Sequence, residues 1–166
     1  MKPLPRWSAR PYVVQNLFNP AFCGLLLWEA IRGYNDTGME YPLSHVVLPM
    51  VLHRDIRYAL PSTARTTLIA WLQGHPEHAV LLPSLISRMV PFTSEGLLWA
   101  TNANVIRVSS LDGKLSILQK PPAADEIVDD QIAEVSHCVH KAGFVGKWLA
   151  KSGSAAVIYA ILGVRP

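Results

Sequence analysis

The pair Asp112-Gly113 stands between two stretches in which apolar and polar residues alternate. Ile106 and Val108 alternate with polar residues before the pair, and Leu115 and Ile117 do so after it. A period of two is typical of a half-buried strand, and an Asp-Gly pair suits the positive φ angles of a tight hairpin turn. The sequence therefore predicts a β-hairpin centred on Asp112-Gly113.

Short helices are predicted to come before this hairpin. Apolar residues recur at helical spacing from Ser62 to Gly74, from Pro76 to Met89 and again after Thr93. Pro83 and Pro91 are expected to divide or stop these helices, because proline lacks the N–H that a helix interior needs. Helices followed by a hairpin are the order of a winged helix, so residues 62–118 are predicted to be winged-helix-like.

Further helices are predicted on both sides of this segment. Asn19-Pro20 favours a helix start, because asparagine caps well and proline suits the first turn. The other helices are expected over Leu43 to Leu52, Asp125 to Ala142, and Ala155 to Leu162, with breaks or bends at Gly143 and Gly146. The predicted fold class is mostly α with a small β-hairpin: a winged-helix-like domain with additional N- and C-terminal helices.

The chain is expected to divide into an arm and one domain. Residues 1–16 contain three prolines and no apolar periodicity, which predicts an extended N-terminal arm. Residues 17–166 are predicted to form a single winged-helix-like helical domain, a length that suits one core. The arm is basic, with Lys2, Arg6 and Arg10.

The composition favours a protein that binds other proteins. Half of the residues are hydrophobic, only 16% are charged, and the mean hydropathy is +0.22. A chain this apolar often covers part of its surface with a partner. No run reaches the roughly 18–20 apolar residues of a membrane-spanning helix, and the N-terminus lacks the apolar region of a signal peptide. We therefore expect a cytoplasmic protein without a membrane partner.

The search for chemistry yields two weak candidates. His137 and His140 share a helix face and could meet one metal ion, but nothing supplies a third and a fourth ligand. The run from Gly143 to Lys147 resembles a P-loop only superficially, because Trp148 stands where a hydroxyl should bind Mg²⁺. Close packing of two helices at these glycines is the preferred interpretation.

The cysteines do not suggest an enzyme either. Cys23 and Cys138 lie in apolar helical patterns and in no nucleophile motif, so we expect two reduced, buried thiols. Carboxylate pairs suited to acid–base work are absent outside an acidic cluster at residues 125–134, which is interpreted as a solvated helix start. The sequence thus predicts no catalytic residue and no cofactor.

DNA binding is the alternative function that a winged helix suggests. The candidate recognition helix, Thr93 to Asn102, has no Lys or Arg and one acidic residue, whereas phosphate neutralisation drives most DNA affinity. The net charge of +3 and pI of about 9.0 are mild. Basic residues that could touch nucleic acid lie on the predicted hairpin and in the arm: Arg107, Lys114, Lys2, Arg6 and Arg10.

Four phrases of the sequence together resemble a known family. They are Phe18-Asn19-Pro20-Ala21-Phe22-Cys23, Leu48-Pro49-Met50-Val51-Leu52-His53, Ala59-Leu60-Pro61 and the terminal Leu162-Gly163-Val164-Arg165-Pro166. In this order and spacing they resemble the middle component of bacterial three-component ABC systems. The resemblance runs from about Phe18 to the C-terminus.

The resemblance implies a non-catalytic adaptor or sensor subunit that links an ABC-type ATPase to an effector in bacterial antiphage or conflict defence. The partners would be that ATPase and that effector, with a phage-derived trigger as a further candidate. Most motif positions have a structural interpretation, whereas the polar His53 and Arg165 could bond to a partner. Together with Arg107 and Lys114 they are the predicted partner-binding residues.

Overall fold

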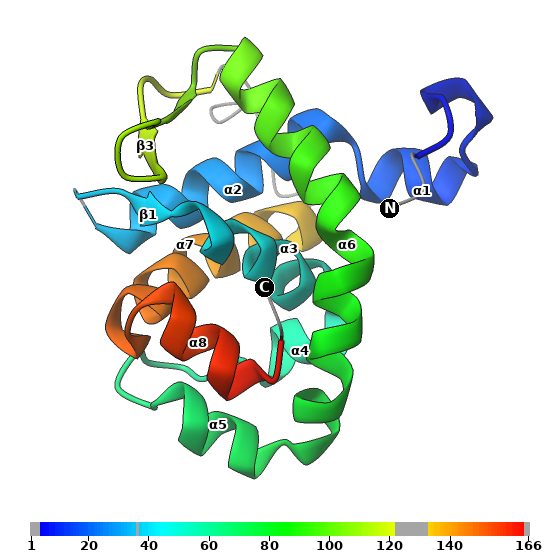
Figure 1. The fold of residues 1–166 in the computed structure, drawn as a ribbon. Helices are drawn as coiled ribbons and strands as arrows, with labels where there is room; N and C mark the ends of the chain where they lie inside the picture. The colour runs from blue at the N-terminus through cyan, green and yellow to red at the C-terminus, as the bar shows by residue number, and fades with distance from the viewer. Residues whose placement is uncertain (1–3, 36, 122–132, 165–166) are drawn as a thin grey trace.

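The computed structural model describes residues 4–35, 37–121 and 133–164, which are mostly helical with a small antiparallel sheet (Figure 1). In chain order the elements are η1 (Trp7–Ala9), α1 (Tyr12–Leu17), α2 (Pro20–Tyr34), β1 (Met39–Glu40), η2 (Tyr41–Leu43), α3 (Ser44–Leu52), α4 (Arg54–Ala59), α5 (Leu68–Gly74), α6 (Pro76–Asn102), β2 (Ile106–Val108), β3 (Lys114–Ile117), α7 (Ala133–Ser152) and α8 (Ala155–Leu162).

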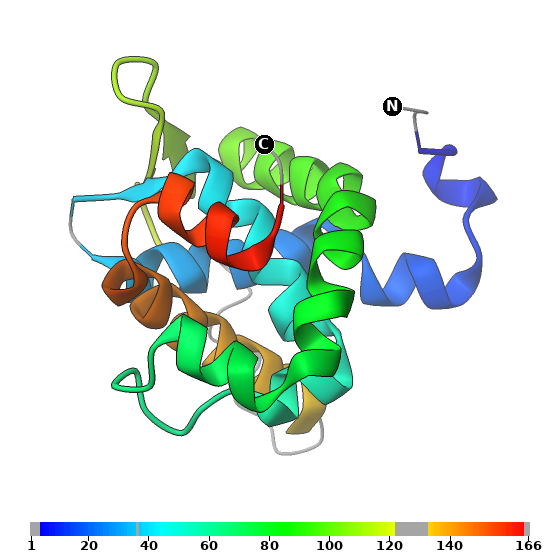
Figure 2. The same cartoon turned by 60° about the horizontal axis from the view of Figure 1, so that its bottom comes forward.

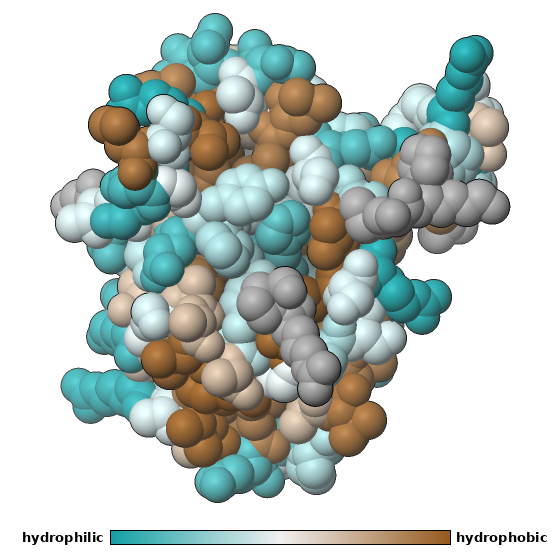
Figure 3. Space-filling model, viewed as in Figure 1, coloured by the Kyte–Doolittle hydropathy of each residue, from teal (hydrophilic) through white to brown (hydrophobic). Residues whose placement is uncertain are grey.

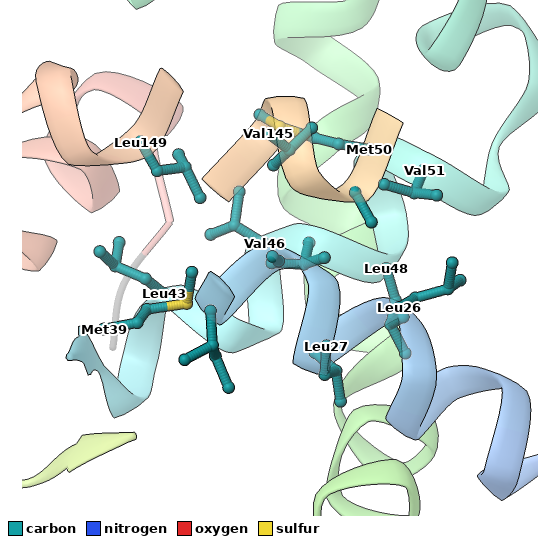
Figure 4. Packing of buried hydrophobic residues seen from close by; sticks show 14 of the residues in the cluster. Leu26, Leu27, Met39, Leu43, Val46, Leu48, Met50, Val51, Val145 and Leu149 are labelled. Carbon is teal, nitrogen blue, oxygen red and sulfur yellow. The ribbon is translucent and has the colours of Figure 1, made fainter. Parts of the chain in front are cut away.

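Helix α2 lies at the centre of the fold, because it packs extensively against both α6 and α7. It starts as predicted: the Asn19 side chain accepts a hydrogen bond from the Ala21 amide at 2.9 Å, and Pro20 occupies the first turn. Helix α3 is apolar almost all round and contains Pro49 in its interior, so the predicted helix over Leu43 to Leu52 is confirmed. Figure 4 shows Leu26, Met50 and Val145 among the side chains that α2, α3 and α7 contribute to the core.

Small residues let α7 approach α2 very closely. A Cβ atom added to Gly146 would lie 1.8 Å from the Ala30 carbonyl oxygen, and one added to Gly33 would lie 2.1 Å from the Gly143 carbonyl oxygen. The predicted close packing of two helices at these glycines is therefore confirmed. The predicted breaks at Gly143 and Gly146 are wrong, because α7 runs on to Ser152 and its contact with α2 outweighs the low helix propensity of glycine.

Helix α6 corrects the expectation of separate short helices before the hairpin. It runs unbroken for 27 residues and contains both Pro83 and Pro91 in its interior. Each proline removes a helix hydrogen bond, but Leu82, Ile86 and Leu97 are buried along the whole length of the helix. Packing against α2 and α3 thus keeps the helix continuous.

The hairpin is confirmed, and a third strand joins it. Strands β2 and β3 pair antiparallel with Val108 opposite Leu115, and Gly113 takes a φ of +65° in the turn. The two-residue strand β1 adds to the other edge of β3, with Met39 opposite Leu115. Sequence patterning missed β1 because two residues are too few to show a period.

Several boundaries also differ from the prediction. Residues 7–9 and 12–17 are helical, so the expected extended conformation of residues 1–16 is wrong there. Helix α5 begins at Leu68 with Thr67 as its cap, later than Ser62. Helix α8 ends at Gly163 as expected, with φ of +67°. The start of the helix predicted from Asp125 lies outside the described residues.

Candidate functional site

The arm, defined here as residues 4–17, stands off from the body of the molecule. Figures 1 and 2 show η1 and α1 projecting on one side, while the hairpin lies on the opposite side. Large apolar side chains of the arm are exposed, with Tyr12 at 76% and with Trp7 and Leu17 more than one third exposed. We call Trp7, Tyr12 and Leu17 the arm surface.

An ion pair fastens the arm to α6. Two guanidinium nitrogens of Arg10 donate to the two carboxylate oxygens of Glu95 at 2.7 and 2.6 Å, and Arg10 Nε donates to the Pro5 carbonyl oxygen. The Arg10 side chain is buried, and the bond to Glu95 raises the pKa of Arg10. Where the arm joins α2, the ring of Phe18 stacks on the ring of Phe92 of α6, with their centroids 4.2 Å apart. Arg10 therefore serves arm attachment and offers little charge to nucleic acid.

The hairpin carries a second exposed apolar surface. Leu111 in the turn is 98% exposed, and Val108 and Leu118 on the two sides of the turn are exposed as well. Figure 3 shows hydrophobic side chains gathered at the upper left, where Figure 1 places the hairpin. We call Val108, Leu111 and Leu118 the hairpin surface.

The two basic residues predicted on the hairpin lie close to this surface. Arg107 is exposed on β2, in register with Ser116 of β3. Lys114 Nζ lies 3.9 Å from a carboxylate oxygen of Asp112. A hydrogen bond from the Ser109 side chain lowers the pKa of Asp112, so the turn holds a stable negative charge next to Lys114.

The structure does not bring the remaining predicted residues to one site. His53 caps α4, where its Nδ1 accepts from the Ile56 amide at 3.5 Å, which is a structural role. Arg6 is exposed on the arm. Lys2 and Arg165 lie outside the described residues. The candidate recognition helix from Thr93 onward is part of α6, and its Gly96 faces Cys23 and Gly24 of α2.

Metal and nucleophile candidates gain no support from the geometry. Within residues 4–35, 37–121 and 133–164, no three histidine, cysteine or acidic side chains gather as metal ligands. Both cysteines are free and buried. Burial raises the pKa of Cys23 to about 12 and also raises the pKa of Cys138, so both thiols stay protonated near neutral pH.

A buried arginine that sequence reasoning missed lies beside a pocket. Arg57 of α4 is only 2% exposed; it donates through Nη1 to the Val51 carbonyl oxygen at 2.6 Å and through Nη2 to Glu134 of α7. The pocket has a volume of about 490 Å³ and opens between α1 and the body. In sequence, Arg57 looks like an exposed residue of a short polar helix, and no local pattern marks it as buried.

A comparison with protein families decides the identity. The model of the family ABC-three component (ABC-3C) system Middle Component 3 matches residues 7–166. The chain belongs to this family. Neither the curated proteins nor the solved structures compared with the chain match it.

The family match confirms the resemblance drawn from the four sequence phrases and extends it. That resemblance begins near Phe18, whereas the match starts at residue 7 and so includes η1 and α1 of the arm. Residues 7–17 of the arm therefore lie within the part of the chain that the family model covers. Among the described residues, no helix of the middle component has the length and apolarity to cross a membrane.

Proposed function

We propose that this middle component is a non-catalytic adaptor that links an ABC-type ATPase to an effector in a cytoplasmic antiphage or conflict-defence system. The observation that carries the proposal is the pair of apolar surfaces, one on the arm and one on the hairpin, at opposite sides of the molecule (Figures 1 and 2). A subunit that links two proteins needs two such separate surfaces. Family membership supports a role within a three-component ABC system.

The arm surface has the aromatic composition of an interface core, whereas the hairpin surface is aliphatic. Aromatic residues are enriched at interfaces, and buried Trp and Tyr often dominate the binding energy. The arm surface offers Trp7 and Tyr12, and the hairpin surface offers Leu111 at the tip of the turn. Arg107 and Lys114 place positive charge beside the hairpin surface, which favours a partner with a complementary acidic rim.

Single substitutions on the two surfaces test the proposal. We expect Tyr12→Asp to abolish binding to one of the two other components, and Leu111→Asp to abolish binding to the other, because each buries a charge in an interface core. Val80→Asp is the matched control, since Val80 on α6 is 82% exposed, between Tyr12 and Leu111, but belongs to neither surface. Pull-downs of each component separately give the readout. Unchanged capture of both components by both variants would contradict the proposal.

The rival function is a winged-helix subunit that contacts DNA. Arg107, Lys114 and Arg6 could supply charge, but Arg10 is paired with Glu95 and the Thr93–Asn102 segment packs on α2. Titration of duplex DNA at two salt concentrations separates the two functions. Under the adaptor proposal no binding is seen at low salt, whereas binding with a steep salt slope would support the rival.

A further inference from the structure

Helix α8 is apolar on every side, yet part of it is exposed to solvent. The single polar group among its eight side chains is the Tyr159 hydroxyl, which donates to the Pro42 carbonyl oxygen at 2.7 Å. The outward residues are exposed or half-buried: Ala156, Val157, Ala160 and Ile161. A helix that is apolar all round is normally buried, and eight residues are too few for the roughly 20 of a membrane span. We therefore expect another molecule to cover this face of α8.

A hollow of about 290 Å³ lies beside this face, between α8, α5 and the end of α7. Ile69 of α5 and Val157 of α8, which are 50% and 48% exposed, line it together with Ile161 and the buried ring of Trp148. Figure 3 shows hydrophobic side chains at the lower left, where Figure 1 places α5 and α8. We call Arg65, Ile69, Trp148, Lys151, Val157 and Ile161 the α5–α8 groove.

Both charged side chains of the α5–α8 groove are cations. Arg65 and Lys151 are exposed, and no carboxylate lines the hollow with them. Within the described part of the chain neither forms an ion pair, whereas Arg10, Arg32 and Arg57 each have a carboxylate partner. A complementary partner therefore carries apolar side chains next to carboxylates.

A second copy of the chain and a membrane both fit this groove poorly. An isologous contact would bring two sets of Arg65 and Lys151 together without a carboxylate to offset them. A flat bilayer surface leaves a hollow unfilled, and two cations are fewer than the roughly 4–8 that typically bind anionic lipids. A side chain of a partner helix can enter the hollow, and a groove between two helices suits a helix laid into it.

We propose that the α5–α8 groove binds an amphipathic helix of a partner protein, with its apolar side chains on Ile69, Val157 and Ile161 and its carboxylates opposite Arg65 and Lys151. This interaction goes beyond the proposed linking function, because no residue of the groove belongs to the arm surface or the hairpin surface. The middle component can thus hold this helix while both linking surfaces are occupied.

A fluorescently labelled peptide of three Glu-Leu-Leu-Glu repeats is the probe, and its anisotropy is measured with the whole chain. We expect saturable binding that weakens at high salt, because the ion pairs at the exposed rim are screened. A peptide of three Lys-Leu-Leu-Lys repeats has the same apolar pattern with the opposite charge and should bind at least tenfold more weakly. The amide NMR signals of Ile69 and Val157 should move with the Glu peptide, whereas that of Leu111 should not.

Two variants test the apolar and the charged part of the groove separately. Val157→Glu should weaken binding of the Glu peptide at least tenfold and keep α8 folded, because a glutamate three residues after the cap Ser154 can complete a capping box. Val80→Glu is the matched control, since Val80 is an exposed valine of α6 outside the groove. The double variant Arg65→Gln/Lys151→Gln keeps the apolar walls and should weaken binding about fivefold.

Three results with the peptides would overturn the proposal. The first is the absence of saturable binding of the Glu peptide. The second is equal binding of the Glu and Lys peptides, which would leave only unspecific apolar contact. The third is undiminished binding by Val157→Glu, which would place the peptide elsewhere. Tyr12→Asp and Leu111→Asp leave the groove intact and should bind the Glu peptide as the parent does, so this test is separate from that of the linking function.

The other two occupants are tested with the same variant. Vesicles of phosphatidylcholine and phosphatidylserine that bind the chain, but not Val157→Glu, would assign the groove to a membrane. A concentration-dependent dimer that Val157→Glu dissociates would assign it to a second copy. We expect neither, and either one would overturn the proposal.

Discussion

The substitution Gly146→Ala tests the close contact between α2 and α7. The added methyl carbon would lie 1.8 Å from the Ala30 carbonyl oxygen and 2.7 Å from the Ala30 carbonyl carbon. Both atoms belong to the backbone of α2, so no side chain can rotate away. The helices must separate by roughly 1 Å or more to reach van der Waals contact, and this strains the core on either side of them.

The expected loss of stability follows from two opposing terms. Overpacking of a core costs about 1–3 kcal/mol, and a backbone obstacle places this site at the upper end. Alanine regains at most about 1 kcal/mol of helix propensity over glycine. We therefore expect Gly146→Ala to lower the free energy of unfolding by about 2 kcal/mol, which corresponds to a fall in Tm of about 4–8 °C for a chain of this length.

Gly143→Ala, three residues earlier on the same helix, is the matched control. A Cβ there would lie no closer than 3.5 Å to Glu29 Oε2, an ordinary contact with a flexible side chain. This variant should be as stable as the parent, or up to about 1 kcal/mol more stable. Urea unfolding followed by tryptophan fluorescence measures both, because Trp148 is buried in the same helix. A Gly146→Ala variant no less stable than Gly143→Ala would show that the contact between α2 and α7 at Gly146 does not exclude a methyl group.

Two further predictions concern the arm and a buried thiol. Arg10→Met removes the ion pair with Glu95, so chymotrypsin should cleave the arm faster at Trp7 and Tyr12, while Arg6→Met, at an exposed position, should not change the cleavage rate. Burial raises the pKa of the Cys23 thiol from 9.0 in the unfolded chain to about 12 in the folded protein. The protonated thiol therefore contributes its full stabilisation below the unfolded-state pKa, and this stabilisation is lost as the pH rises through the folded-state pKa. Cys23 should therefore resist a thiol reagent at mildly alkaline pH until urea unfolds the chain, and rapid labelling of the native protein would contradict its burial.

Local signals in the sequence predict a good part of the fold. The hairpin at Asp112-Gly113, the cap at Asn19 and the stop at Gly163 each depend on residues that are neighbours in the chain, and all three are found. The continuous helix α6 could not be predicted, because the packing that compensates for Pro83 and Pro91 comes from α2 and α3, which are distant in sequence.

The candidate site was harder to predict than the fold. Arg107 and Lys114 could be placed on the hairpin, since they follow from its register. The pairing of Arg10 with Glu95 joins residues 85 positions apart, and the burial of Arg57 depends on α7. Neither leaves a local pattern, because an arginine on a short helix or arm has the same sequence appearance whether it is solvated or buried.

Co-expression of all three components, followed by mass determination of the purified assembly, tests the linking function most directly. We expect one complex that contains the ATPase, the effector and this middle component, and that separates into its parts when the chain carries both Tyr12→Asp and Leu111→Asp. A middle component that elutes alone as a monomer, or an ATPase–effector complex that persists without it, would contradict the linking function.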